Sequence, residues 1–113
     1  MAAQGQDDRI CGKTIRWSFS EGPVQGKSFE HRFRDDGTVV WRELGGAAPA
    51  QGDQETGVPY TALRLSDDVG LASYLAGSGY TLTVALNFDT GELRGVASND
   101  KHWYPLRGTF EIA

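Results

Sequence analysis

The chain alternates apolar and polar residues with a period of two over most of its length. In 14–20, TIRWSFS, every second residue is apolar, which is typical of a β-strand that buries one face. In 27–34, KSFEHRFR, Phe29, His31 and Phe33 share one face, and Glu30, Arg32 and Arg34 share the other. A histidine on an apolar face is either a packed core residue or the polar group of a binding cavity.

Turn signals divide the chain into short strands. The Asp-Gly pair at 36–37 readily takes the positive φ angles of a hairpin turn. Segment 69–76 also fits a short helix capped by Asp67. Gly70 and Ser73 weaken that helix, and the alternating segment that follows favours a hairpin. The predicted strands are 14–20, 27–34, 38–44, 58–66, 69–76, 80–89, 92–100 and 103–112, with no long helix.

Short sequential strands joined by tight turns predict an all-β antiparallel meander. Closing it into an up-and-down barrel of about eight strands removes the exposed edges and leaves an interior for side chains or one small ligand. A two-sheet sandwich is the alternative. We expect a single domain over 1–113, in which 1–11 is a flexible N-terminus. The aperiodic segment 45–57 is a candidate lid over the barrel.

Charge and composition narrow the expected partners. The 113 residues include 11 Lys plus Arg against 15 Asp plus Glu, for a net charge of −4, and no basic stripe. We therefore expect neither nucleic acid nor a membrane surface as a partner. Cys11 is the only cysteine, and no signal pattern or long apolar run is present, so a cytoplasmic location is predicted. The sequence leaves a homodimer open.

The sequence offers little for a metal or a cofactor. Its two histidines, His31 and His102, have no metal-ligand spacing, and Asn99, Asp100 and His102 together fit a solvated turn better than a metal site. The glycine-rich stretches do not precede a helix, so they build no phosphate cradle. We predict no metal and no cofactor.

Three stretches carry a family resemblance: GKTIRWSFSEGPVQGKSFEHRFRDDGTVVWRE, SYLAGSGYTLTVALNFDTGELRGVASND and RGTFEIA. The chain resembles the MoaF-like proteins, named after molybdenum cofactor biosynthesis protein F, over 12–113 apart from the segment 45–57. The resemblance implies a small lipocalin-like (calycin-related) barrel and no settled reaction. Lipocalins place an arginine of the last strand over a tryptophan of the first strand. Arg107 over Trp17 is the corresponding hypothesis here.

The candidate site is the apolar face that the strands turn toward the barrel interior. Its inward row is Trp17, Phe19, Phe29, His31, Phe33, Tyr80, Leu82, Val84 and Leu86. The residues predicted to contact a ligand are Trp17, Phe29, His31, Trp41, Tyr60 and Tyr74. We expect the partner to be a small apolar or aromatic molecule, with His31 as its main polar contact. Two alternatives stay open: a lyase, isomerase or decarboxylase that uses His31 and tyrosine hydroxyls as acid and base, and a structural or interaction barrel with a filled core.

Overall fold

The computed structural model describes residues 7–21, 25–44, 57–77 and 79–113. Within these residues the chain forms eight strands and no helix. The strands are β1 (Thr14–Glu21), β2 (Ser28–Phe33), β3 (Thr38–Leu44), β4 (Val58–Arg64), β5 (Val69–Leu75), β6 (Thr81–Asn87), β7 (Glu92–Ser98) and β8 (Trp103–Ile112). Each lies within two residues of its predicted bounds at both ends, and β5 is a strand as expected.

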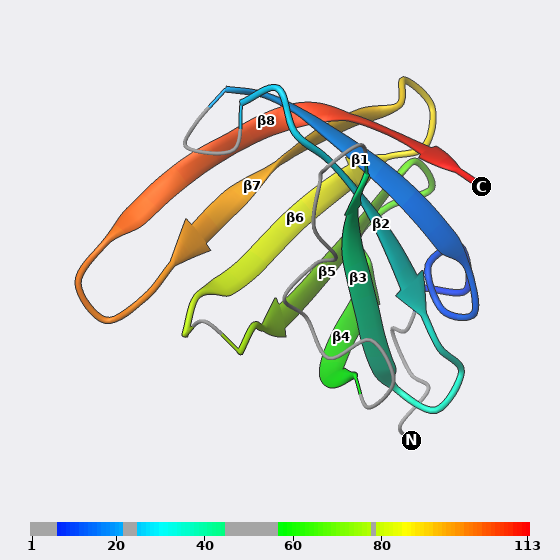
Figure 1. Ribbon diagram of the computed structural model, residues 1–113. Coiled ribbons are helices and arrows are strands. Elements are labelled where there is room, and N and C mark those ends of the chain that lie inside the picture. Colours follow the sequence, from blue (N-terminus) through cyan, green and yellow to red (C-terminus); the bar gives the residue numbers. More distant parts are fainter. Residues whose placement is uncertain (1–6, 22–24, 45–56, 78) are drawn as a thin grey trace.

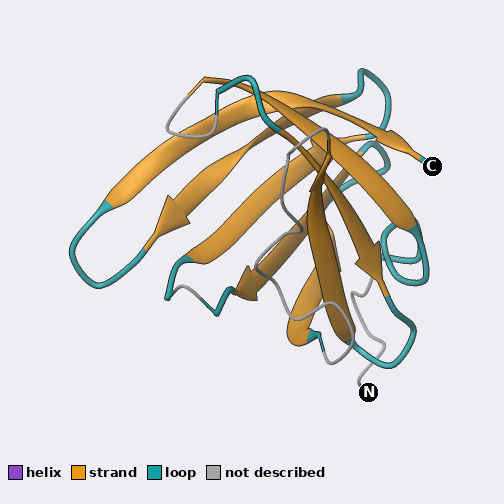
Figure 2. Cartoon of the chain, viewed as in Figure 1, coloured by secondary structure: helices purple, strands orange, loops and turns teal. Residues whose placement is uncertain are grey.

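The strands close into an antiparallel up-and-down barrel, which confirms the predicted fold and excludes the two-sheet sandwich. Each strand pairs with its neighbours in sequence, and β8 returns to pair with β1 (Figures 1 and 2). The β3–β4 pairing is short: it consists of Thr38 with Pro59 and Val39 with Val58. By contrast, β6 and β7 pair over seven residues each. The half of β3 that follows Val39 therefore has no strand partner on its β4 side among the described residues.

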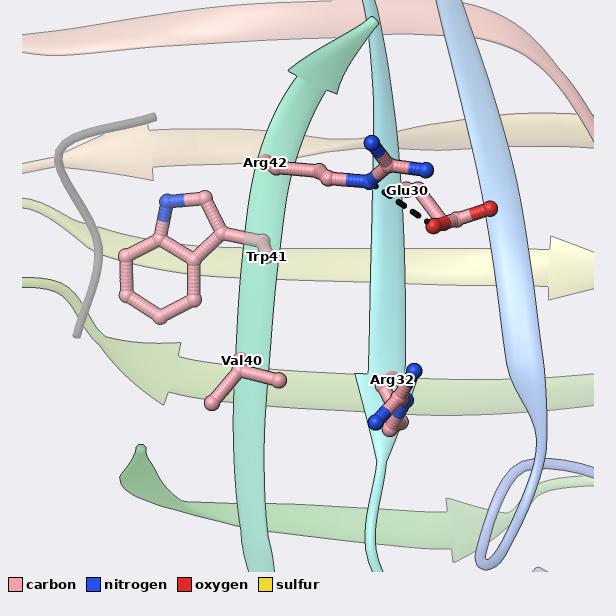
Figure 3. A pocket seen from close by; sticks show the side chains of 5 residues that line it. All are labelled: Glu30, Arg32, Val40, Trp41 and Arg42. Carbon is pink, nitrogen blue, oxygen red and sulfur yellow. Dashed lines mark hydrogen bonds and ion pairs between the residues drawn. The ribbon is translucent and has the colours of Figure 1, made fainter. Parts of the chain in front are cut away.

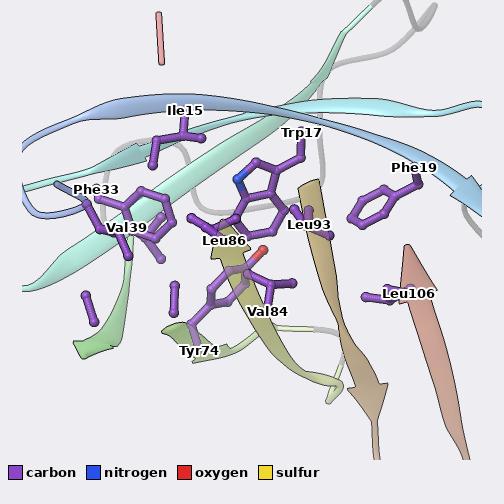
Figure 4. Packing of buried hydrophobic residues seen from close by; sticks show 13 residues of the cluster. Ile15, Trp17, Phe19, Phe33, Val39, Tyr74, Val84, Leu86, Leu93 and Leu106 are labelled. Carbon is purple, nitrogen blue, oxygen red and sulfur yellow. The ribbon is translucent and has the colours of Figure 1, made fainter. Parts of the chain in front are cut away.

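The predicted alternation sets the core. Apolar residues at every second position of the strands point inward and fill most of the interior (Figure 4). The buried hydrophobic cluster is Ile10, Ile15, Trp17, Phe19, Phe33, Val39, Ala62, Ala72, Tyr74, Val84, Leu86, Leu93 and Leu106. The buried position 108 of β8 is a glycine, where a Cβ would overlap the backbone carbonyl of Ser18 on β1. This close approach is possible only for glycine.

The segment before β1 closes one end of the barrel. The amide of Asp7 donates to the carbonyl of Ala62 (3.1 Å), and the side chain of Ile10 is fully buried. Arg9 lies over the ring of Phe88, with its guanidinium carbon 4.5 Å from the ring centroid. Residues 7–11 therefore pack against the barrel, although the sequence pattern placed them in a flexible terminus; residues 1–6 lie outside the described residues. Removing the apolar side chain of Ile10 from water provides the favourable free energy for this packing.

The buried carboxylate of Asp7 is held by Arg9. Asp7 is inaccessible to solvent and accepts hydrogen bonds from the backbone amide (2.9 Å), Nε (2.8 Å) and Nη2 (2.7 Å) of Arg9. Burial would raise the pKa of the Asp7 carboxyl, but the hydrogen bonds and charge of Arg9 hold it below its ordinary value. Arg9 also donates to backbone carbonyls of the β4–β5 turn, including those of Ser66 and Asp67. The closing segment is thus attached to that turn.

The outer face of β1–β3 is charged. Glu30 lies between Arg16 and Arg42 and accepts a hydrogen bond from the Nε of each at 3.0 Å. Arg107 also lies on the outer face, because its neighbours Leu106 and Gly108 are the buried, inward residues of β8. The predicted contact between Arg107 and Trp17 is therefore wrong: the fully buried Trp17 is on the other side of the sheet.

The described residues contain no helix that is long and apolar enough to cross a membrane.

Candidate ligand-binding cavity

A cavity of about 140 Å³ lies inside the barrel. It is lined by Trp17, Phe19, Phe29, His31, Trp41, Tyr74, Leu82, Ala97 and Leu106. Along β1, Ile15 belongs to the core near the closing segment, whereas Phe19, four residues further on, lines the cavity. Figure 4 shows this arrangement, with Ile15 and Phe33 on one side of Trp17 and Phe19 and Leu106 on the other. The cavity therefore lies beyond Trp17, toward the end away from the closing segment.

Five of the six residues predicted to contact a ligand line this cavity: Trp17, Phe29, His31, Trp41 and Tyr74. Tyr60 does not line it. Its ring packs edge-on against Phe33 (centroids 5.0 Å apart), and its hydroxyl donates to the carbonyl of Arg34 at 2.9 Å. Tyr60 thus belongs to the packed half of the barrel. Its inward phase on β4 is as expected, but its height along the barrel could not be read from the alternation alone.

The other lining residues were partly visible in the sequence. Phe19 and Leu82 belong to the predicted inward row but not to the predicted contact residues. Ala97 and Leu106 on the last two strands were missed as site residues. The alternation of 92–100 and 103–112 was the available signal, but it does not distinguish a cavity wall from ordinary core. Ala97 has the smallest side chain of the nine lining residues.

The polar centre of the cavity is a pair formed by His31 and Tyr74. The Nε2 atom of His31 lies 2.7 Å from the hydroxyl oxygen of Tyr74. His31 is 2% exposed and Tyr74 is 7% exposed. Burial lowers the pKa of His31 to about 3, and burial raises the pKa of Tyr74 well above its ordinary value. Both side chains are therefore neutral near pH 7.

Two buried nitrogens near this pair have no hydrogen-bond partner. They are Nδ1 of His31 and the indole Nε1 of Trp17. The two rings are stacked, with centroids 3.7 Å apart and planes 20° apart. Buried polar groups of folded proteins are nearly always paired, and an unpaired group costs free energy. Both nitrogens are themselves closed to solvent, so neither is exposed on the cavity surface.

Aromatic rings surround the pair, some stacked and some edge to face. His31 and Trp41 have planes 21° apart, and Trp41 and Tyr74 have planes 29° apart with centroids separated by 4.8 Å. Phe19 and Phe29 contact each other edge to face at 5.9 Å. Rings as close as Trp41 and Tyr74 contact each other and leave no gap between them, so a guest would lie beside this stack, against aromatic surface.

Trp41 separates the cavity from an outer hollow. It is half-buried, lies beyond the last β3–β4 residue pair, and lines both spaces. The outer hollow has a volume of about 220 Å³ and is lined by Glu30, Arg32, Val40, Trp41 and Arg42 (Figure 3). Glu30 and Arg42, which are directly opposite each other on β2 and β3, form an ion pair at one side of it. The inner cavity is the smaller but better enclosed candidate.

Metal-binding geometry is not found in the part of the chain that the structure describes: no three His, Cys, Asp or Glu side chains gather there. The Asn99 side chain instead accepts hydrogen bonds from the amides of Lys101 (2.9 Å) and His102 (2.7 Å). The segment 99–102 is therefore a turn closed by Asn99.

No protein-family model matches this chain, and no curated protein matches it in sequence. Its fold does match solved structures. One is a crystal structure from Burkholderia vietnamiensis described as a "putative beta-lactamase", with a TM-score of 0.74 and 18% identity. The match covers 96% of this chain and 98% of the other chain. At this identity, the likeness shows a shared small barrel fold.

Proposed function

We propose that this protein binds one small apolar or aromatic molecule inside the barrel. The observation that carries the proposal is the cavity of about 140 Å³, whose walls are aromatic and aliphatic except for the His31–Tyr74 pair. Mostly apolar walls with a few fixed polar groups are the usual composition of a small-molecule site. The alternative of a filled core is less well supported, because the inward side chains of the described residues leave this cavity among them.

The cavity volume limits the size of the molecule. An engineered apolar cavity of about 150 Å³ binds benzene, whereas pockets for drug-sized molecules start at about 300 Å³. The volume of about 140 Å³ therefore suits a guest of about one ring. A long fatty acid or a fused polycyclic compound would need more space than the described residues enclose.

One observation favours the enzyme alternative and one opposes it. His31 and Tyr74 are in hydrogen-bonding contact, as acid/base chemistry would need. However, burial lowers the pKa of His31 to about 3, far from the near-neutral value that suits a general acid or base. We therefore prefer binding to catalysis, and His31 stays the best candidate only if a reaction is found.

The resemblance to the MoaF-like proteins supports a lipocalin-like role, since proteins of that shape typically hold ligands inside the barrel. The beta-lactamase description belongs to the Burkholderia protein and is not carried over to this chain. The cytoplasmic location stays a prediction, and the question of a homodimer stays open.

Filling the cavity tests the proposal. Isothermal titration with toluene should give saturable binding with a 1:1 stoichiometry to the native protein. Ala97→Leu places three more carbon atoms in the cavity and should abolish binding. The matched control is Val96→Leu, because the exposed Val96 is the neighbouring residue on the outer face. Equal binding by Ala97→Leu, or no saturable binding of any one-ring probe to the native protein, would contradict the proposal.

A further inference from the structure

We infer that the molecule bound in this cavity is an uncharged aromatic compound with a hydrogen-bond acceptor, such as an aryl carbonyl, held by the His31–Tyr74 pair. This inference rests on the proposed function and adds the chemical class of the ligand.

The first step is a count of the protons in the pair. A neutral imidazole has one N–H and one bare nitrogen, and a phenol has one O–H. If the Tyr74 hydroxyl donates to Nε2, the proton of His31 is on Nδ1, which has no partner. If Nε2–H donates instead, the Tyr74 O–H is left to donate, and its only described hydrogen bond is the one to His31. One donor is therefore unused in either tautomer.

The second step is the position of that donor. His31 and Tyr74 both line the cavity, and each is more than nine-tenths buried. The indole nitrogen of Trp17, in contrast, lies on the side of its ring away from Phe19 (Figure 4). The other lining side chains are hydrocarbon and indole groups, which offer no oxygen acceptor. Nδ1 of His31 is itself closed to solvent, so the donor that a molecule in the cavity can reach is the Tyr74 hydroxyl, which is unused when Nε2–H donates to it. Its acceptor must come from a ligand or water.

The third step is charge. No Lys, Arg, Asp or Glu is among the lining residues. A carboxylate placed here would lose its hydration and gain a single neutral donor, which does not offset the cost of burying a charge. A neutral carbonyl loses much less on leaving water and needs only one donor. The stacked rings of Trp41 and Tyr74 line the cavity and offer aromatic surface next to the acceptor, which favours an aromatic guest.

Acetophenone and α-methylstyrene test the acceptor directly, because they have nearly the same shape and differ by C=O in place of C=CH2. The ratio of their dissociation constants should be compared in the native protein and in the variant His31→Leu/Tyr74→Phe, which has no donor in the pair. The difference in hydration between the two probes is the same for both proteins and cancels. One neutral hydrogen bond contributes up to about 1.5 kcal/mol, so the preference for the ketone should fall by about tenfold in the variant.

Thr83→Val is the matched control. It removes one hydroxyl of the Ser73–Thr83 hydrogen bond (2.8 Å), which joins two half-buried residues that alternate with the inward Tyr74 and Val84. The preference for acetophenone should be unchanged in this variant. Binding of α-methylstyrene by the double variant reports that its cavity is still formed.

A second comparison needs no variant of the pair. Benzamide and benzoate are planar and similar in size, and benzoate is an anion at pH 7. Native protein should bind benzamide at least tenfold more tightly than benzoate.

The failures can be told apart. If both hydrocarbon and ketone bind but the double variant keeps the preference of the native protein, the acceptor inference is overturned and the proposed function stands. Benzoate binding as tight as that of benzamide would overturn the uncharged class. If no one-ring probe binds to the native protein, both the inference and the proposed function fall.

Discussion

The side chains of His31 and Tyr74 meet across the barrel at 2.7 Å, although 43 positions separate them in the sequence. They belong to β2 and β5, which are not paired with each other in the sheet. The hydrogen bond therefore spans the interior rather than following the strand ladder. It joins the two halves of the barrel on either side of the short β3–β4 pairing.

Tyr74→Phe should destabilise the protein by about 1–3 kcal/mol, because Nε2 of the buried His31 loses its partner without access to water. The free energy of unfolding is obtained from urea denaturation followed by tryptophan fluorescence. Thr83→Val is the control and should cost less, because Thr83 is only half-buried and its partner Ser73 keeps partial access to solvent. Equal stability of the two variants would show that the interior hydrogen bond contributes no more to the free energy of unfolding than the half-buried one.

Stability should fall as the pH is lowered from about 6.5. The ordinary pKa of histidine is about 6.5 in the unfolded chain, whereas burial lowers the pKa of His31 to about 3 in the folded protein. Between these values the unfolded state binds one proton more, so acidification favours unfolding. The free energy of unfolding should decrease by up to about 1.4 kcal/mol per pH unit.

His31→Leu should remove this component, so the variant should lose less stability than the native protein between pH 6.5 and pH 5. Denaturant titrations at half-unit intervals measure both slopes. From about one pH unit above 6.5, His31 should add no pH dependence, because it is then neutral in both states. Parallel slopes for the two proteins would mean that His31 is not desolvated in solution.

Loss of Arg9 should lower the free energy of unfolding more than loss of Asp7. Arg9→Met leaves a fully buried carboxylate without its cation and should cost about 3–5 kcal/mol. Asp7→Asn should cost less, because Arg9 keeps its backbone carbonyl acceptors and its contact with Phe88. Urea denaturation of the two variants and of their combination measures the difference. A larger loss for Asp7→Asn would contradict the proposed role of Arg9.

Gly108→Ala should destabilise the barrel by about 1–3 kcal/mol, because its Cβ would overlap the carbonyl of Ser18 and force β1 and β8 apart. Gly77→Ala is the matched control: no atom lies within 4 Å of the added Cβ, and a change near zero is expected. Thermal unfolding followed by circular dichroism compares the two. A Gly108→Ala variant as stable as Gly77→Ala would show that the strands can separate at no cost.

The strands could be predicted from the sequence because alternation with a period of two determines both the element and its buried face. The same pattern placed Trp17 and His31 inside, and it should have placed Arg107 outside, next to the inward Leu106. The contact of Arg107 with Trp17, which the resemblance to lipocalins implied, contradicts this alternation and is wrong. The arginine that covers an aromatic ring is Arg9, from the closing segment.

The height of each residue along the barrel could not be predicted, because it depends on the register of all eight strands together. Tyr60 and Tyr74 are directly paired on β4 and β5, yet only Tyr74 lines the cavity. The burial of Asp7 was equally invisible, since a charged residue near the start of a chain carries no periodic signal. The expected lid at 45–57 falls almost entirely on residues 45–56, outside the described residues.

The most direct test of an occupied interior is the set of intermolecular nuclear Overhauser effects between acetophenone and the isotope-labelled protein. Binding in the cavity predicts contacts from the ligand protons to Trp17, Phe19 and Leu106, which are buried and line the interior. Contacts restricted to Arg32 and Val40 of the outer hollow, or no saturable contacts at all, would contradict it.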